Sequence, residues 1–146
     1  GPNDPAAQWT LSPSKSSYAV GDVVTATLTL SNAAGVYGAE VRQAYNPKQL
    51  RPTTANPLPA RNEPGALFAQ DTLTPRNTAA EGAIFVQAAQ VGEAARPADG
   101  LLAQVAFQVI GCGATTFDTR GVRLTDGKGG ALPFNAGPPL TLPSCK

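Results

Sequence analysis

Two cysteines, Cys112 and Cys145, are the first residues of this sequence whose type and spacing suggest chemistry. Each lies in a turn-like stretch, Gly111-Cys112-Gly113 and Pro143-Ser144-Cys145. A zinc site would need more ligands than these, and the chain has no Cys-x-x-Cys pair and no histidine. We therefore predict one disulfide, which would join the end of the chain to the body of the domain and is typical of an exported protein. The alternative is a pair of inert thiols.

The acidic residues offer little for catalysis. Without histidine there is no Ser-His-Asp triad and no imidazole base. No pair of carboxylates suggests glycosidase chemistry, and the nucleophile-elbow, phosphate-loop and dinucleotide motifs are missing. Four acids lie in contexts typical of turns rather than of calcium sites: Asp22, Asp99, Asp118 and Asp126. We expect a protein that is not an enzyme and holds no metal or cofactor of its own.

The composition limits the remaining classes of function. Eleven basic and ten acidic residues give a net charge of +1, and no basic cluster suggests a nucleic-acid or membrane-surface binder. The 42% hydrophobic content argues against disorder, and no apolar run approaches the roughly 18 residues that cross a bilayer. Gly1-Pro2 resembles a protease-cleavage scar. We expect residues 1–8 to be a flexible leader and residues 9–146 to form one domain, a monomer.

Alternation of apolar and polar residues predicts strands throughout the chain. Residues 24–30 place valine, alanine and leucine on one side and three threonines on the other. Residues 36–45 alternate too, but Gln43 falls on the apolar side. Five prolines in residues 52–82 favour a loop over one end of the domain, with one helical turn at 65–69. Further strands are expected at 8–12, 83–91, 102–110, 115–124, 131–135 and 140–142, which makes an all-β sandwich.

A series of short motifs resembles the cohesin domain family in order and spacing over residues 9–143. It comprises Val20–Leu28, Val36–Val41, Tyr45–Leu50, Gly82–Gly92, Asp99–Phe107 and Val122–Asp126. The resemblance implies a nine-stranded jelly-roll sandwich in an extracellular or cell-surface protein. It also implies a partner, which is a dockerin module on another extracellular protein. The dockerin carries calcium and docks on a flat sheet of the cohesin that is formed by strands 8, 3, 6 and 5. The domain itself would contact polysaccharide only indirectly.

Taking residues 83–91 as strand 5 and 102–110 as strand 6 predicts which side chains face the partner. Glu40 falls where related cohesins place an acidic dockerin contact, although Glu40 and Arg42 could instead be a solvated charge pair. Phe85 is an aromatic that should face water, as an interface anchor does, unless a bulge turns it into the core. The predicted partner-binding residues are Gly38, Glu40, Arg42, Phe85, Gln87, Leu102 and Gln104.

Two other functions suit a sandwich of this kind. One is a structural module of an adhesin, fibre or surface-layer protein that has no dockerin partner. The other is a carbohydrate-binding module, which usually stacks sugars on a planar strip of exposed aromatic rings. The tryptophan and tyrosines available for such a strip are Trp9, Tyr18, Tyr37 and Tyr45.

Overall fold

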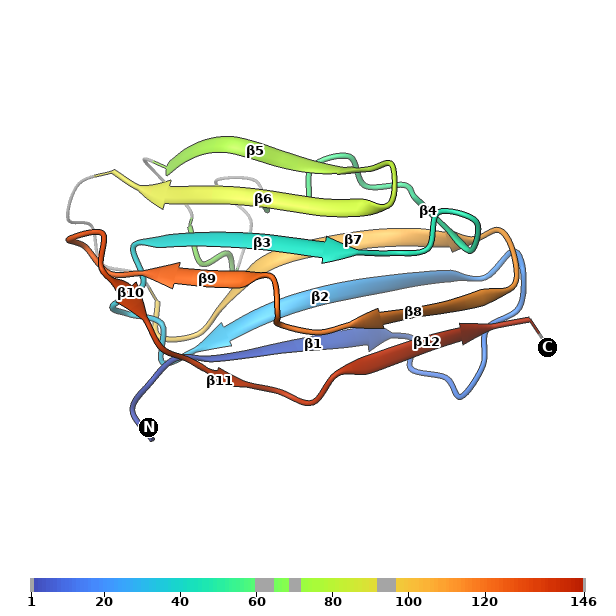
Figure 1. Cartoon of the computed structure of the whole chain (residues 1–146), viewed down its shortest axis with the longest axis horizontal. Helices are drawn as coiled ribbons and strands as arrows, with labels where there is room; N and C mark the ends of the chain where they lie inside the picture. The colour runs from blue at the N-terminus through green and yellow to red at the C-terminus, as the bar shows by residue number, and fades with distance from the viewer. Residues whose placement is uncertain (1, 60–64, 69–71, 92–96, 146) are drawn as a thin grey trace.

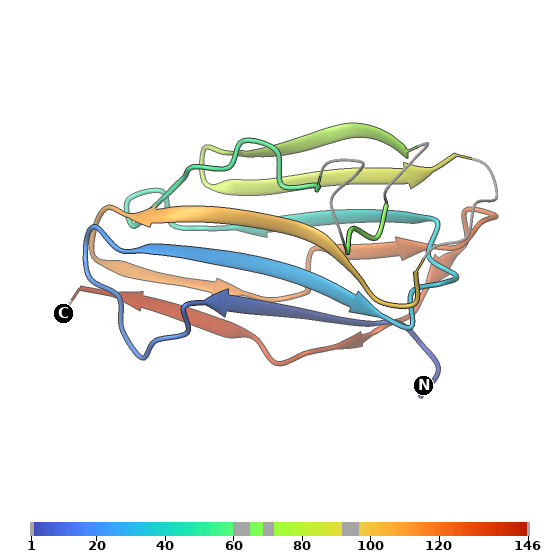
Figure 2. The ribbon, with the colours of Figure 1, turned by 180° about the vertical axis from the view of Figure 1, so that it is seen from behind.

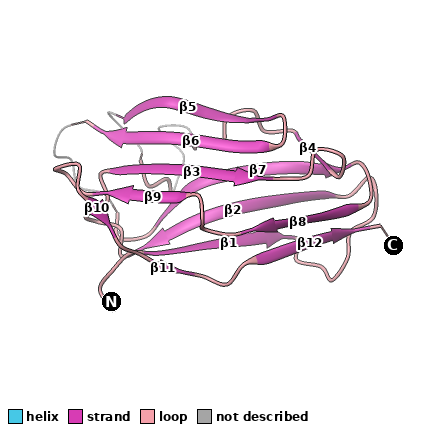
Figure 3. Cartoon of the chain, in the orientation of Figure 1, coloured by secondary structure: helices cyan, strands magenta, loops and turns pink. Residues whose placement is uncertain are grey.

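The computed structural model describes residues 2–59, 65–68, 72–91 and 97–145, and it is built from strands, as predicted (Figure 3). No helix occurs in this described part of the chain. Twelve strands replace the nine expected, and three of the twelve have only two or three residues. They are β1 (Ala6–Ser12), β2 (Val23–Ser31), β3 (Gly38–Ala44), β4 (Leu50–Pro52), β5 (Thr72–Ala80), β6 (Ala83–Gln90), β7 (Gly100–Val109), β8 (Gly113–Phe117), β9 (Val122–Thr125), β10 (Ala131–Leu132), β11 (Asn135–Ala136) and β12 (Leu140–Ser144).

The strands form two five-stranded sheets and one separate pair. The front sheet has the order β10-β9-β3-β6-β5, and Figure 1 shows its strands along the upper part of the molecule. The back sheet has the order β11-β1-β2-β7-β4, and its long strands are seen in Figure 2. Strands β8 and β12 pair with each other beside the two sheets. Strand β1 begins at Ala6 and buries Ala7, so residues 6–8 belong to the sandwich rather than to a flexible leader.

The apolar sides of the two sheets meet in one core. The alternation of residues 24–30 has the predicted effect, because its valine, alanine and leucines are at most 2% exposed. Val41, Ile84 and Val86 of the front sheet are fully buried against them. A chain of tilted aromatic contacts runs through the same core and comprises Trp9, Phe117, Phe107 and Tyr45.

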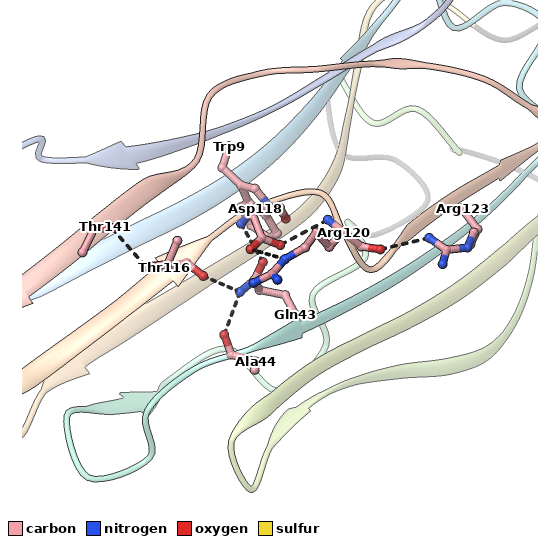
Figure 4. Close-up of polar contacts among 8 residues, drawn as sticks. All are labelled: Trp9, Gln43, Ala44, Thr116, Asp118, Arg120, Arg123 and Thr141. Atoms are coloured by element: carbon pink, nitrogen blue, oxygen red, sulfur yellow. Dashed lines mark hydrogen bonds and ion pairs between the residues drawn. The ribbon is translucent and has the colours of Figure 1, made fainter.

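Gln43, the polar residue on the apolar side of β3, is buried with its amide fully used (Figure 4). Its Nε2 donates to the carbonyl oxygens of Ala44 at 2.7 Å and Thr116 at 2.9 Å. Its Oε1 accepts the backbone N–H of Asp118 at 3.0 Å, and the Trp9 indole donates to the Asp118 carbonyl at 2.8 Å. The glutamine therefore ties β3 to the end of β8 and to Asp118 just after it, which explains why a polar group is tolerated in the core.

The predicted disulfide is present and lies where β8 and β12 meet. Cys112 and Cys145 are bonded with a Cα–Cα distance of 4.7 Å. Beside them lies a buried amide that sequence reasoning missed, because Gln49 is fully buried and its Nε2 donates to the Leu142 carbonyl at 2.8 Å and the Ser144 hydroxyl at 3.0 Å. The end of the chain is thus held covalently and by hydrogen bonds.

The loop predicted for residues 52–82 is wrong for residues 72–80, which form the edge strand β5. Pro75 is tolerated there because the pairing of β5 with β6 shifts register between Leu73 and Arg76. Segment 53–58 lies against β5, since the Ala79 N–H donates to the Ala55 carbonyl and the Asn56 amide to the Asn77 carbonyl. The helical turn expected at 65–69 is also wrong for its described residues 65–68; residue 69 lies outside the described residues.

Candidate binding face

The outer side of the front sheet gathers side chains from four strands into rows. Because register fixes the neighbours, Glu40 of β3 lies opposite Gln87 of β6 and Arg123 of β9, and Gln87 lies opposite Arg76 of β5. The next row runs from Arg42 through Phe85 to Thr78. These outward rows of β9, β3, β6 and β5 are here called the front face.

Phe85 lies at the centre of the front face and is half-buried by two arginines. The Arg42 guanidinium lies 4.3 Å from the ring centroid and the Arg76 guanidinium lies 5.1 Å from it. These are cation–π distances. The neighbours Ile84 and Val86 are fully buried, so Phe85 points outward as the alternation predicts. The alternative that a bulge places Phe85 in the core is wrong.

Glu40 is held by an amide rather than by the neighbouring arginine. The Gln87 Nε2 donates to Glu40 Oε1 at 2.7 Å. Arg42, expected as its partner in a solvated charge pair, instead lies over Phe85. The predicted residues Glu40, Arg42, Phe85 and Gln87 are therefore brought together on one surface.

A shallow hollow of about 320 Å³ opens on the front face beside this cluster. Its lining includes Glu40, Gln87, Pro75 and Arg123. Gly38 also belongs to it but is buried, and a Cβ there would clash with the Thr125 hydroxyl. Gly38 thus gives Thr125 room and offers no exposed side chain, in contrast to its predicted place on the face.

Leu102 and Gln104 do not belong to the front face, and their prediction as partner-binding residues on that sheet is wrong. Their strand, β7, pairs with β2 and β4 in the back sheet. Leu102 is fully buried because a register shift between Leu28 and Thr29 turns both Leu102 and Ala103 inward. Gln104 is exposed on the far side of the molecule and donates to the Thr27 hydroxyl at 3.1 Å.

The error follows from the missed strand β5. With no strand expected between 52 and 82, residues 83–91 became the fifth strand and 102–110 the sixth, one place too early. Residues 131–135 were expected to form the strand that pairs with β3 on its other side, but β9 occupies that position. Sequence reasoning therefore missed the front-face residues of β5 and β9, which include Leu73, Arg76, Thr78 and Arg123. The prolines of residues 52–82 exclude a central strand but allow an edge strand, and this was the only signal for β5 in the sequence.

Asp22, Asp118 and Asp126, three of the four acids expected in turns, accept hydrogen bonds from nearby backbone N–H groups. Asp126 Oδ1 accepts the backbone N–H groups of Lys128 and Gly130, each at 2.8 Å, and these bonds lower the pKa of its carboxyl. The Ala19 N–H and the Lys15 ammonium lower the pKa of Asp22 in the same way. Within the described residues, no three His, Cys, Asp or Glu side chains gather in a way that could hold a metal ion. No helix in the described part is long and apolar enough to span a membrane.

Comparison with known proteins agrees with this arrangement of strands. The sequence model of the cohesin domain matches residues 8–130. This chain belongs to the cohesin domain family. The cohesin domain is a binding module. No curated protein matches this chain.

Solved cohesin structures share the fold of this cohesin across most of its length. A type II cohesin domain from the cellulosome of Acetivibrio cellulolyticus is 19% identical with a TM-score of 0.70, and 95% of each chain is covered. An interface mutant of a type II cohesin–X-dockerin complex from the same organism is 17% identical with a TM-score of 0.68. The match covers 97% of this chain and 99% of that chain. A non-cellulosomal cohesin from the archaeon Archaeoglobus fulgidus is 18% identical with a TM-score of 0.63. The match covers 98% of this chain and 91% of that chain.

Proposed function

We propose that this cohesin is a non-catalytic receptor that binds a dockerin module of another protein through its front face. The observation that carries the proposal is Phe85, a large ring held outward at the centre of a sheet by arginines 4.3 and 5.1 Å from its centroid. A preordered aromatic flanked by arginines is typical of an interface hot spot, because it loses little side-chain entropy on binding.

The surroundings of Phe85 support docking of a partner on the outer side of the front sheet. Leu73, at the edge of the same face, is 62% exposed and would extend the apolar contact. Glu40 and Gln87 place a polar pair next to the ring, which suits the mixed character of a reversible protein interface. Glu40 remains the residue for which the cohesin resemblance predicts a direct contact.

The proposal includes the setting of the complex. Calcium would be carried by the dockerin, so binding would depend on calcium although the described residues of this chain gather no group of ligands for a metal ion. The Cys112–Cys145 disulfide supports an extracellular or cell-surface location. We expect the free protein to be a monomer, and polysaccharide to be reached only through the dockerin-bearing partner.

The carbohydrate-binding alternative has less support. Trp9, Tyr18 and Tyr45 are at most 6% exposed, so three of the four rings considered for sugar stacking lie in the core. The structural-module alternative predicts no dockerin partner, and the binding test below separates it from the proposal.

The test is a binding screen with the dockerin modules encoded in the genome that encodes this chain, in calcium and in EGTA. We expect at least one calcium-dependent complex in isothermal titration calorimetry. The Phe85→Ala variant should bind it about thirtyfold or more weakly, as expected for a hot spot. Gln104→Ala on the back sheet is the matched control and should bind normally. Absence of binding to every dockerin would reject the proposal, and an equal loss in the control would reject the front face.

A further inference from the structure

The charges of the front face are unbalanced. Its four strands carry three arginines, Arg42, Arg76 and Arg123, and one acid, Glu40. The strands of the back sheet carry a single charged residue, Arg51. The front-face strands therefore hold three of the four arginines of the two sheets and a net charge of +2, against +1 on the strands of the back sheet.

We propose that the dockerin surface recognised by this cohesin is acidic, and that its carboxylates bind Arg42 and Arg76 on either side of Phe85. This inference rests on the proposed function, because it names the chemistry of the partner at the same face. It reverses the polarity implied by the cohesin resemblance, in which the acid, Glu40, is the contact.

The geometry of the two arginines leaves them ready for carboxylates. A guanidinium over an aromatic ring uses its flat surface, whereas its five N–H donors point outward in the plane. Both side chains are exposed, and no carboxylate among the described residues forms an ion pair with either. By contrast, Arg120 is paired with Asp118 at 3.1 Å and Lys15 with Asp22 at 3.0 Å.

The arrangement also places two like charges around one ring. Arg42 comes from β3 and Arg76 from β5, the strands that flank β6, so both cations approach Phe85 from neighbouring strands. Their mutual repulsion opposes this arrangement in the free protein, and a carboxylate bound between them would relieve it. Phe85 fixes the guanidiniums in place, so fewer rotamers are lost when the partner binds.

The face favours protein carboxylates over an anionic polysaccharide. Sugar rings bind by stacking on open aromatic faces, but guanidiniums from both neighbouring strands lie against the Phe85 ring. The exposed Leu73 at the edge offers apolar contact that suits a protein surface rather than a polyanionic glycan.

The first arm of the test uses a dockerin that binds in the screen. The double variant Arg42→Gln/Arg76→Gln is compared with Arg51→Gln/Arg120→Gln, which removes equal charge elsewhere. Between about 0.05 and 0.5 M NaCl, we expect the first variant to bind about tenfold or more weakly and to lose most of the salt dependence. Asp→Asn or Glu→Gln changes on the dockerin should couple to the arginines in double-mutant cycles. Unchanged affinity and salt dependence, with Phe85→Ala still impaired, would overturn the acidic partner and leave the docking face intact.

The second arm needs no dockerin, so it applies even if the proposed function fails. A poly-glutamate peptide is titrated against this chain and the Arg side-chain Nε–Hε resonances are followed by NMR. We expect larger shifts at Arg42 and Arg76 than at Arg51 and Arg120, and no such difference with poly-lysine. Equal shifts at all four arginines would overturn the inference. Tighter binding of polygalacturonate than of poly-glutamate at this pair would also overturn it, in favour of an anionic glycan.

Discussion

The outer surfaces of the two sheets differ in the types of residue they carry, although the inner surfaces of both are apolar. Thr25, Thr27 and Thr29 of the back sheet face outward, and Thr27 accepts a hydrogen bond from Gln104. On the front face the equivalent outward positions hold arginines around a phenylalanine. Both sheets bury an apolar side in one core, so folding accounts for the inner residues of both. Folding alone does not require the Arg–Phe–Arg cluster, which is why we assign the front face to binding.

The largest expected effect on stability comes from the disulfide, which lies outside both sheets. Its cysteines are 33 residues apart, and removing it with Cys112→Ser/Cys145→Ser should lower the free energy of unfolding by about 3–4 kcal/mol. Because β8 and β12 do not contribute to the front face, dockerin affinity below the unfolding transition should not change. Urea titration measures the first quantity and calorimetry the second. A large loss of affinity in the folded variant would show that the face depends on the disulfide.

The second prediction compares the two sides of one strand. Gln43→Leu removes the partner of the Asp118 N–H and of the Ala44 and Thr116 carbonyls, and should cost about 2–3 kcal/mol of stability. Its neighbour Arg42 points outward, and Arg42→Leu should change stability by no more than about 1 kcal/mol, the worth of its exposed cation–π contact with Phe85. Thermal and urea unfolding of both variants give the comparison. Equal costs would contradict the division of β3 into a stabilising side and a binding side.

The third prediction concerns the close contact in the front face. Gly38→Ala drives a Cβ into the Thr125 hydroxyl and should cost about 1–2 kcal/mol. Adding Thr125→Ala removes the clashing oxygen, while its Cβ stays 3.7 Å from the new methyl, and should restore most of the loss. Gly35→Ala is the control, because nothing lies within 4 Å of its Cβ position. Failure of the second change to rescue the first would disprove this role for Gly38.

The sequence was sufficient to predict the fold class and the direction of most side chains in the long strands. Alternation is a local property, and burial of one side forces it, so residues 24–30 and the outward position of Phe85 followed directly. The disulfide also followed, because two cysteines without other ligands leave few options. Motif order then led to the family.

What could not be predicted depends on pairing between distant segments. Two hydrogen-bond partners of Gln43, Thr116 and Asp118, lie 73 and 75 residues further along the chain. No local sequence pattern can therefore predict these bonds. Strand β5 has a proline and a register shift, which hide its alternation, and Arg76 was missed with it. Leu102 was misplaced because a bulge shifts the inward side of β7, and bulges depend on the neighbouring strand.

The smallest predicted effect concerns one turn carboxylate beside each sheet. Asp126 follows β9 of the front sheet, and Asp22 precedes β2 of the back sheet. Backbone N–H groups lower the pKa of both below the ordinary value of 3.8, and Lys15 adds to the effect at Asp22. A lowered pKa means that the folded protein binds fewer protons than the unfolded chain. The stabilisation is therefore complete above the ordinary pKa and is lost as the pH falls through the lowered pKa of the folded state.

Asparagine at either position separates the charge from the turn geometry. Both backbone N–H groups at Asp126 donate to the same oxygen, Oδ1, and the side-chain carbonyl of an asparagine keeps one such acceptor. Asp126→Asn should therefore abolish the loss of stability below pH 3.8, and near neutrality it should lower stability by the amount that the unmodified protein loses on acidification through this group. Asp22→Asn should do the same, and should also remove a salt-sensitive contribution, because its Oδ2 lies 3.0 Å from the exposed Lys15 ammonium. Urea unfolding at several pH values and two salt concentrations tests this difference. Equal salt sensitivity at the two turns would mean that the direct Lys15 contact adds no more at Asp22 than the attraction of the Lys128 charge adds at Asp126.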